Sequence, residues 1–211
     1  MMGDRFATPS KLGVLLAEAG LAGLTDAESG RLADYLELLL RWNARTNLTA
    51  IRDGDGILRR HFVESIACAR SLPGGIRSLL DFGSGAGFPG IPISVCRPEL
   101  EVTLAEAQNK KAAFLNEVVR TLRLHTKVFS GRAESMSSQF DCVTLRAVDR
   151  MTNAIEAAVG LLSPTGYLAV MTTENNRHQV ITAAGPSLEW SPIMRLPGSE
   201  QRVLFLGGRS S

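Results

Sequence analysis

The sequence predicts an α/β fold in which a mostly parallel, seven-stranded sheet carries helices on both faces and follows an N-terminal helical extension. Two observations support this prediction. From Ile76 onward, short apolar strands alternate with helical patterns, as they do in sheets built from strand–helix–strand units. The first 75 residues instead repeat apolar side chains at helical spacing. We therefore expect a helical extension over residues 1–75 and a second domain over residues 76–211, packed together as one compact unit.

The composition excludes several classes of protein. Of the 211 residues, 45% are hydrophobic and 21% are charged, which is close to the average of globular domains and unlike a disordered chain. No uncharged apolar stretch reaches the ~18 residues of a membrane span, and the first residues lack the layout of a signal peptide. The three cysteines, Cys68, Cys96 and Cys142, form no C-x-x-C pair. We therefore expect reduced thiols in a cytoplasmic, monomeric protein with no disulfide and no metal site.

Three helices are predicted in the extension. Ser10 is placed to cap a first helix that ends at Gly20. Thr25 and Glu28 form a capping box, in which each side chain accepts a hydrogen bond from a backbone N–H at the start of the second helix. Apolar side chains at helical spacing follow in the second helix (Leu32, Leu36, Leu39 and Leu40, to about Trp42) and in a third that begins near Asp55 (Leu58, Phe62 and Ile66).

The second domain is predicted to alternate strands with helices. Strands are expected at Ile76–Phe82, Glu101–Ala105, Thr126–Phe129, Asp141–Leu145, Gly166–Met171, Ile193–Leu196 and Arg202–Leu206. Helical patterns lie between them at Ile91–Cys96, Lys110–Leu122, Met151–Leu161 and Glu174–Ala184. Because no long helical stretch separates the last two strands, we expect them to form an antiparallel hairpin at one edge of the sheet.

A glycine-rich segment follows the first strand of this domain. Residues 83–90 read Gly-Ser-Gly-Ala-Gly-Phe-Pro-Gly, and a helical pattern comes next. A strand, a glycine-rich turn and a helix in this order let a ligand approach backbone amides at the start of the helix. Phe88 stands where the dinucleotide fingerprint requires its last glycine, which disfavours an NAD-dependent oxidoreductase. The alternative for this segment alone is an ordinary tight turn.

Two acidic residues and a third segment accompany the glycines. Asp81 directly precedes them, where its carboxylate could hold the ammonium group of a ligand or the amides of the loop. Glu106 ends the second strand, where a carboxylate can accept both hydroxyls of a ribose. Arg132, Ala133 and Glu134 follow the third strand and could line an adenine. Together these features indicate a site for an adenosine that carries a positive group, as S-adenosylmethionine (SAM) does.

From about Leu36 to Leu206, the chain resembles a known family, the bacterial 16S rRNA guanine-N7 methyltransferases called RsmG or GidB. The motifs that carry the resemblance are Arg41-Trp42-Asn43, Asn47-Leu48-Thr49, Arg60-His61-Phe62 with Ser65, Leu80–Pro92, Lys110-Lys111 with Phe114-Leu115, Arg132-Ala133-Glu134, and Asp141 with Arg146-Ala147. The resemblance implies a class I SAM-dependent (Rossmann-like) methyltransferase fold and methylation of guanine N7 in the 530 loop of 16S rRNA. It implies 16S rRNA or the small ribosomal subunit as partner.

The resemblance also implies the site residues. It places cofactor contacts at Gly83, Phe88, Ala133, Glu134 and Arg146, to which the residue patterns add Asp81, Ser84, Gly85, Gly87 and Glu106. Two positions depart from the family. Glu64 stands where the family has Asp, and Met171-Thr172-Thr173 replaces a Lys-Gly pair, so a contribution of that lysine to RNA or to the pocket is missing.

The residues also indicate how the reaction proceeds. Guanine N7 has a free lone pair and needs no general base, and the chain has no Pro-Pro motif of amino-group methylases. Cys142, in an apolar strand, is not expected to be a nucleophile. Arg146 is the candidate catalytic residue, positioning the substrate or the cofactor; the alternative is a structural salt bridge with Asp141 or Glu134. His61 is expected to fasten the extension to the second domain.

The charge is unevenly distributed although the net charge is only +2. Seven arginines lie between residues 41 and 77 against three acids, a local charge of +4. We expect rRNA contacts from Arg59, Arg60, Lys110 and Lys111, and the alternative is a solvated surface. Trp42 is expected to be half-buried under the helix of His61. Asn43 and Asn47, four residues apart, are expected to order the end of their helix.

Three other functions stay open from the sequence. The chain could be a class I methyltransferase that acts on another RNA or on a small molecule. It could be a non-catalytic module that binds SAM or RNA, which the departure at Met171–Thr173 would favour. An NAD-dependent oxidoreductase is the third and is disfavoured by Phe88.

Overall fold

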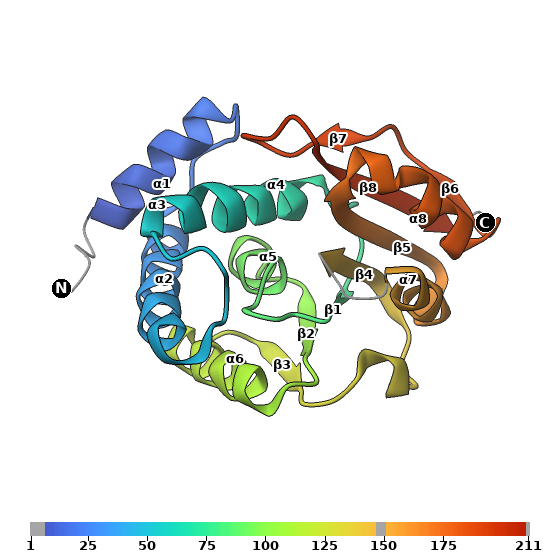
Figure 1. The fold of residues 1–211 in the computed structure, drawn as a ribbon, viewed down its shortest axis with the longest axis horizontal. Helices are drawn as coiled ribbons and strands as arrows, with labels where there is room; N and C mark the ends of the chain where they lie inside the picture. Colours follow the sequence, from blue (N-terminus) through green and yellow to red (C-terminus); the bar gives the residue numbers. More distant parts are fainter. Residues whose placement is uncertain (1–6, 147–150, 210–211) are drawn as a thin grey trace.

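A computed structural model describes residues 7–146 and 151–209, which fold around a single twisted sheet (Figure 1). Ala147, the second residue of the Arg146-Ala147 motif, lies outside the described residues. The strands run in the order β3-β2-β1-β4-β5-β8-β6, and β7 pairs with β8. Their bounds are β1 Ser78–Phe82, β2 Glu101–Ala105, β3 Thr126–Phe129, β4 Phe140–Arg146, β5 Leu162–Thr173, β6 Leu188–Trp190, β7 Met194–Arg195 and β8 Arg202–Arg209.

The sheet is mostly parallel, as the alternating pattern predicts. Strands β1 to β5 pair in parallel, and β8 runs antiparallel to β5, β6 and β7. The expected antiparallel hairpin of β7 and β8 at one edge of the sheet is confirmed, with β7 as its outer strand. The expected number of strands is wrong: the described sheet has eight strands rather than seven, because β6 is a three-residue strand without a clear pattern. Strand β6 also pairs with β8, so β8 lies between β5 and the outer strands β6 and β7.

Helices cover both faces of the sheet. Helices α5 (Gly90–Cys96) and α6 (Asn109–Leu122) pack on one face, and α7 (Met151–Gly160) and α8 (Arg177–Ala184) pack on the other. The amphipathic pattern of α6 explains its position, because the buried residues Leu115, Val118 and Leu122 recur at helical spacing.

The N-terminal extension lies on the α5–α6 side of the sheet. It consists of α1 (Ala7–Glu18), α2 (Asp26–Thr46), and a continuous helical stretch made of α3 (Gly54–Ile57), a π-helical segment (Leu58–Val63) and α4 (Glu64–Ser71). Helix α2 packs beside α6 and α4 packs beside α5 (Figure 1). The extension and this face of the sheet share one hydrophobic core, which includes residues from Leu12 to Leu204.

Two helix starts test the capping predictions. The capping box at Thr25 is confirmed: its hydroxyl accepts from the Glu28 amide, and the Glu28 carboxylate accepts from the Thr25 amide at 2.7 Å. The prediction for Ser10 is wrong, since α1 includes Ala7 and Ser10 lies within the helix. Among the described helices, none is long and apolar enough to cross a membrane.

Candidate active site

A cleft of about 960 Å³ opens at the carboxyl ends of the parallel strands. Ligands of open α/β sheets bind at this edge. The cleft is lined by residues that end or follow β1, β2, β3, β4 and β5, and by Thr49, Arg60, His61 and Glu64 of the extension. Strand β8 contributes Arg202. The extension and the sheet therefore build this cleft together.

The glycine-rich loop presents its open side to this cleft. Gly83 and Gly85 have φ angles of 72° and 58°, in the left-handed region that favours glycine. A Cβ at Gly85 would have only the Gly83 carbonyl oxygen within 4 Å, at 3.9 Å, so the cleft side of this residue is open. Ser84 and Phe88 also line the cleft, although both are buried.

Gly87 is not among the residues that line the cleft, and its hydrogen side faces the protein interior, so its cofactor contact stays a prediction. Its φ angle is 95°, and an added Cβ would lie 2.7 Å from Ile91 Cγ1 and 2.9 Å from Tyr35 Oη. Tyr35, on α2, donates a hydrogen bond to the carbonyl oxygen of Ala86 at 2.5 Å. Gly87 is therefore required for the close packing of the loop against α2.

Asp81 takes the second of the two roles expected for it. Its side chain is 1% exposed and lies outside the residues that line the cleft. One carboxylate oxygen accepts from the Gly90 amide at 3.1 Å, and the other accepts from the Thr144 hydroxyl at 2.9 Å. Burial raises the pKa of Asp81 to about 6, although these hydrogen bonds oppose the rise. Asp81 thus anchors the loop, and a direct contact with a ligand is not supported.

Glu106 lies in the cleft beside the glycine loop. Its carboxylate accepts from the Gly85 amide at 2.9 Å and from the Gln108 amide at 2.7 Å, so it is fixed in orientation before any ligand arrives. Ala133 and Glu134 also line the cleft, in a short 3₁₀ turn (Ala133–Ser135) that follows β3. Three predicted elements, after β1, β2 and β3, therefore meet at one end of the cleft.

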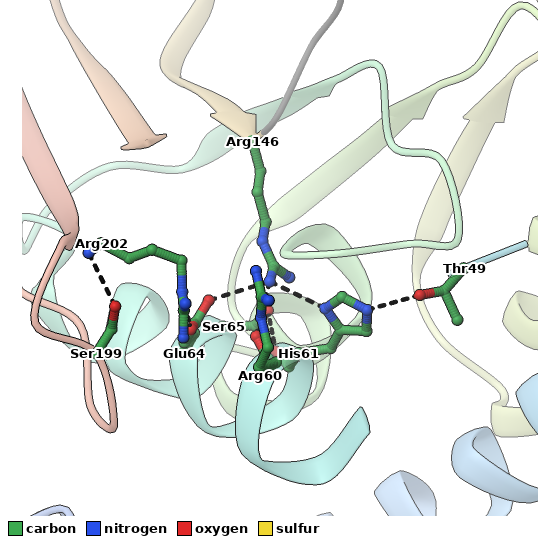
Figure 2. Close-up of polar contacts among 8 residues, drawn as sticks. All are labelled: Thr49, Arg60, His61, Glu64, Ser65, Arg146, Ser199 and Arg202. Carbon is green, nitrogen blue, oxygen red and sulfur yellow. Dashed lines mark hydrogen bonds and ion pairs between the residues drawn. The ribbon is translucent and has the colours of Figure 1, made fainter. Parts of the chain in front are cut away.

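Arg146 ends β4, and its guanidinium contacts Arg60, His61 and Glu64 of the extension (Figure 2). Its Nη2 atom lies 3.0 Å from Glu64 Oε2, 2.7 Å from the carbonyl oxygen of Arg60 and 2.9 Å from His61 Nδ1. An ion pair was expected as the alternative for Arg146, but its partner is neither Asp141 nor Glu134. Asp141 instead accepts from the amides of two other residues, at 2.8 and 3.1 Å.

Glu64 holds two arginines. Its side chain is 1% exposed; Oε2 pairs with Arg146, and Oε1 accepts from Arg202 Nε at 2.6 Å. The three residues come from α4, β4 and β8, far apart in the sequence. No sequence pattern predicted a role for Arg202, and Thr49 belongs to a family motif from which no role in the site was predicted. Both belong to the cleft wall.

His61 connects the extension to this wall, as expected. Its ring stacks on Phe88 with centroids 4.8 Å apart, and its Nε2 lies 2.9 Å from the Thr49 hydroxyl. Burial, assisted by the positive charges of Arg146 and Arg60, lowers the pKa of His61 to about 3. The imidazole is therefore neutral at physiological pH.

The remaining candidates divide into two groups. Arg60 and Lys111 line the cleft, whereas Arg59 pairs with Glu18 on the surface and Lys110 is exposed outside the cleft lining. Trp42 is half-buried as predicted, but it packs on α6, against Phe114, and donates to Glu117 at 3.0 Å. Asn43 and Asn47 order the end of α2 as predicted, through hydrogen bonds to Thr49, Ile51 and Arg52.

Comparisons with known proteins agree with this architecture. The family model described as rRNA small subunit methyltransferase G matches residues 28–185. Ribosomal RNA small subunit methyltransferase G of Roseiflexus sp. (strain RS-1) is 38% identical over 190 residues, which cover 83% of this chain and 81% of the relative. The protein of the same name from Stenotrophomonas maltophilia (strain K279a) is 42% identical over 159 residues, covering 73% and 74%.

Solved structures share the fold at low sequence identity. A SAM-dependent methyltransferase from Aquifex aeolicus superposes with a TM-score of 0.59 at 16% identity, over 74% of this chain and 93% of that chain. TYW2 of P. horikoshii, solved in complex with MeSAdo, gives a TM-score of 0.59 at 14% identity, over 72% and 63%.

Proposed function

This chain belongs to the rRNA small subunit methyltransferase G family, and we propose that its cleft binds SAM and methylates N7 of one guanine in the 530 loop of 16S rRNA. Membership makes it a SAM-dependent rRNA methyltransferase. The target nucleotide and the roles of individual residues belong to the proposal. We further propose that it acts as a monomer in the cytoplasm, where the small ribosomal subunit of bacteria is found.

One observation carries the proposal for the cofactor: an open glycine loop and a buried carboxylate lie side by side in the cleft. Gly83 and Gly85 leave room for close approach, and Glu106 lies 2.9 Å from the Gly85 amide. A carboxylate in this position can accept both hydroxyls of a ribose. Ala133 and Glu134 would line the adenine, Ser84 and Phe88 would complete the cradle, and Asp81 and Gly87 would support the loop from behind.

The chemistry of the wall supports transfer to an atom that carries a free lone pair. SAM supplies a methyl group on a positively charged sulfur. Guanine N7 needs no proton removed before it reacts, so the protein must position the base rather than deprotonate it. Among the candidate bases, His61 faces Arg146, Asp81 lies outside the cleft, and the Glu106 carboxylate accepts from two backbone amides. Cys142 is buried within β4, and burial raises the pKa of its thiol.

Positive side chains around the cleft are proposed to hold the rRNA. Arg60 and Lys111 are at the cleft itself, and Arg59 and Lys110 lie beside them in the sequence on exposed surface. Phosphate contacts by lysine and arginine give nucleic-acid affinity that falls with salt. Arg146 would position the base, because its guanidinium lies in the wall between Phe88 and Glu64.

Methyl transfer from tritiated SAM tests the proposal directly. The protein is incubated with 16S rRNA, both free and in the assembled small subunit, and the labelled base is mapped. We expect label on guanine N7 in the 530 loop. Binding of SAM without transfer to either substrate would favour a non-catalytic module, and label on another base or on a small molecule would overturn the assigned target.

Calorimetry on variants tests the residue roles. Glu106→Gln should weaken SAM binding by about ten- to a hundredfold, because a hydrogen bond to a charged group contributes roughly 1.5–3 kcal/mol. Arg146→Lys should lower turnover while SAM affinity changes little. An unchanged SAM affinity in Glu106→Gln would remove the proposed ribose contact.

A further inference from the structure

The hydrogen bonds of His61 fix the position of its single ring proton. Arg146 Nη2 lies 2.9 Å from His61 Nδ1 and, as part of a guanidinium, cannot accept a hydrogen bond. Its two N–H groups are shared among Glu64, the Arg60 carbonyl oxygen and Nδ1, and a proton on Nδ1 would face them, so we infer that Nδ1 is the unprotonated nitrogen. The proton of the neutral ring therefore resides on Nε2, which donates to the Thr49 hydroxyl oxygen at 2.9 Å (Figure 2). A ring protonated on both nitrogens would place an N–H against a guanidinium N–H, which the geometry forbids.

This assignment determines what the Thr49 hydroxyl can do. Its oxygen accepts from His61 Nε2 and, at 3.3 Å, from the Ile51 amide. A hydroxyl has two acceptor positions and one proton. Both acceptor positions are occupied, so the proton is left to donate. Thr49 is half-buried and lines the cleft, where that proton can meet a ligand.

The surrounding wall also offers donors and no free carboxylate. Both oxygens of Glu64 are bonded to arginines. Arg146 Nη1 is buried and has no hydrogen-bond partner among the described residues. Arg60 adds a further positive side chain at the cleft. Because Arg146 Nη1 is buried, the donors that face the cleft in this part of the wall are the Thr49 hydroxyl and the exposed side chain of Arg60.

The location of this wall indicates which ligand it meets. The glycine loop, Glu106 and the turn at Ala133 occupy the end of the cleft at β1 to β3, which the proposed function gives to the cofactor. Thr49, His61 and Arg146 line the part of the cleft built by the extension and β4, where His61 stacks on Phe88 of the glycine loop, and we assign this part to the base that accepts the methyl group.

Resting on that proposed function, we propose that Thr49 determines base specificity by donating a hydrogen bond to O6 of the target guanine. Guanine carries the acceptor O6 beside N7, whereas adenine carries the N6 amino donor in the same position. A wall of donors accepts guanine and would leave the adenine amino group facing other donors without a partner. His61 acts as a positioning residue, because it holds Thr49 with its proton outward.

The experiment combines two enzymes with two substrates. Wild type and Thr49→Val are given 16S rRNA that carries either guanine or 2-aminopurine at the labelled position; 2-aminopurine keeps N7 and lacks O6. We expect wild type to prefer guanine by roughly tenfold in kcat/KM, the size of one hydrogen bond, and Thr49→Val to lose that preference. Differences at N1 of the two bases affect both enzymes equally and cancel in the ratio.

Control variants separate recognition from folding. Thr49→Ser keeps the hydroxyl and should keep the preference. Thr46→Val removes a hydroxyl that binds the Trp42 carbonyl outside the cleft lining, and it should also keep the preference. If Thr49→Val does not fold, Thr49→Ala replaces it. A structural role for Thr49 would lower the rates on both substrates alike and leave their ratio unchanged, which would overturn the proposal.

A second readout needs neither cofactor nor RNA. The ¹⁵N chemical shifts of His61 distinguish a proton on Nε2 from a proton on Nδ1, and we expect Nε2–H. A proton on Nδ1 would overturn the assignment. Failure of the proposed function and failure of this inference give different results. A wild type that is inactive on 16S rRNA guanine contradicts the proposed function, whereas an active wild type without a Thr49-dependent preference contradicts only the inference about Thr49.

Discussion

At the scale of single residues, the cleft wall places two positive side chains around one buried carboxylate. Glu64 neutralises one of the two guanidinium groups that contact it, so Arg146 and Arg202 together leave an excess positive charge in a buried place. Removing one partner of a buried ion pair costs about 3–5 kcal/mol, because the other charge is left uncompensated. Burial disfavours a charged imidazole at His61, and the neighbouring positive charges add to this effect, which explains why His61 stays neutral.

The neutral state of His61 makes stability depend on pH. The folded-state pKa of His61 is about 3 and lies below the unfolded value of 6.5, so its contribution is present above pH 6.5 and is lost as the pH falls toward 3. The charged groups that face it are Arg60 on its own helical segment, Arg146 and Glu64 beside it, and Arg202 on β8. Between pH 7.5 and pH 5 we expect a loss of about 2 kcal/mol.

Urea unfolding of wild type and His61→Gln measures this loss. Glutamine keeps one acceptor and one donor but does not titrate, so the stability difference between the two proteins should decrease by that amount from pH 7.5 to pH 5. The other histidines are common to both proteins and cancel. A difference that stays constant over this range would show that His61 titrates normally in the folded state.

The sequence predicted those site residues whose roles depend on local order along the chain. Glu106 at the end of β2 and Arg146 at the end of β4 lie in the cleft because parallel strands deliver their carboxyl ends to one edge. Asp81 and Gly87 belong to the same motif but point inward, and a motif does not specify side-chain direction within a turn. Arg202 reaches Glu64 across 138 residues, a contact that only the folded chain creates.

At the scale of elements, the π-helical segment Leu58–Val63 shapes the cleft wall. The predicted apolar residues Leu58 and Phe62 of this segment and Ile66 of α4, which follows it, are all buried. Arg60, His61 and Glu64, which alternate with them, line the cleft instead. A π-helical turn adds a residue to the turn and frequently marks a functional site. Helical spacing predicted the buried face correctly, but it did not predict the wider turn.

The glycine loop allows a comparison of two glycines that differ in their surroundings. Gly85→Ala adds a methyl group to open space in the cleft, and its left-handed φ costs about 1–2 kcal/mol. Gly87→Ala adds the same group against Ile91 and Tyr35 and should cost more, roughly 3 kcal/mol or above once overpacking is included. Denaturant unfolding should therefore rank Gly87→Ala as the less stable variant.

Cofactor binding should show the opposite order. Gly85→Ala occupies space that the ligand would need, so its SAM affinity should fall more than the SAM affinity of Gly87→Ala. Gly87→Ala, to the extent that it is folded at low temperature, should bind SAM more nearly like wild type. Equal losses of stability in the two variants would contradict the packing of Gly87 against α2.

At the scale of the whole molecule, the extension and the second domain differ in their sequence patterns, but we do not expect them to unfold separately. Residues 1–75 were expected as a helical extension, yet the described part of it contributes Leu48, Thr49, Arg60, His61 and Glu64 to the wall of the cleft and shares a core with β1, β2 and α6. The second core, between the sheet and helices α7 and α8, shares no member with the extension. The sheet joins the two cores, so we expect one cooperative unfolding unit.

The two tryptophans report on opposite ends of this unit. Trp42 lies on α2 against α6, and Trp190 lies on β6 against Phe205 in the second core. Single-tryptophan proteins, Trp190→Phe and Trp42→Phe, each carry one probe.

Leu39→Ala, which removes a fully buried side chain of α2, should cost about 2–5 kcal/mol. We expect this change to lower the urea midpoint seen by Trp190 as much as the midpoint seen by Trp42, because unfolding of α2 exposes the sheet that supports both cores. A midpoint that shifts at Trp42 while Trp190 is unaffected would show that the extension unfolds independently, and the cleft would then be built between two domains instead of within one.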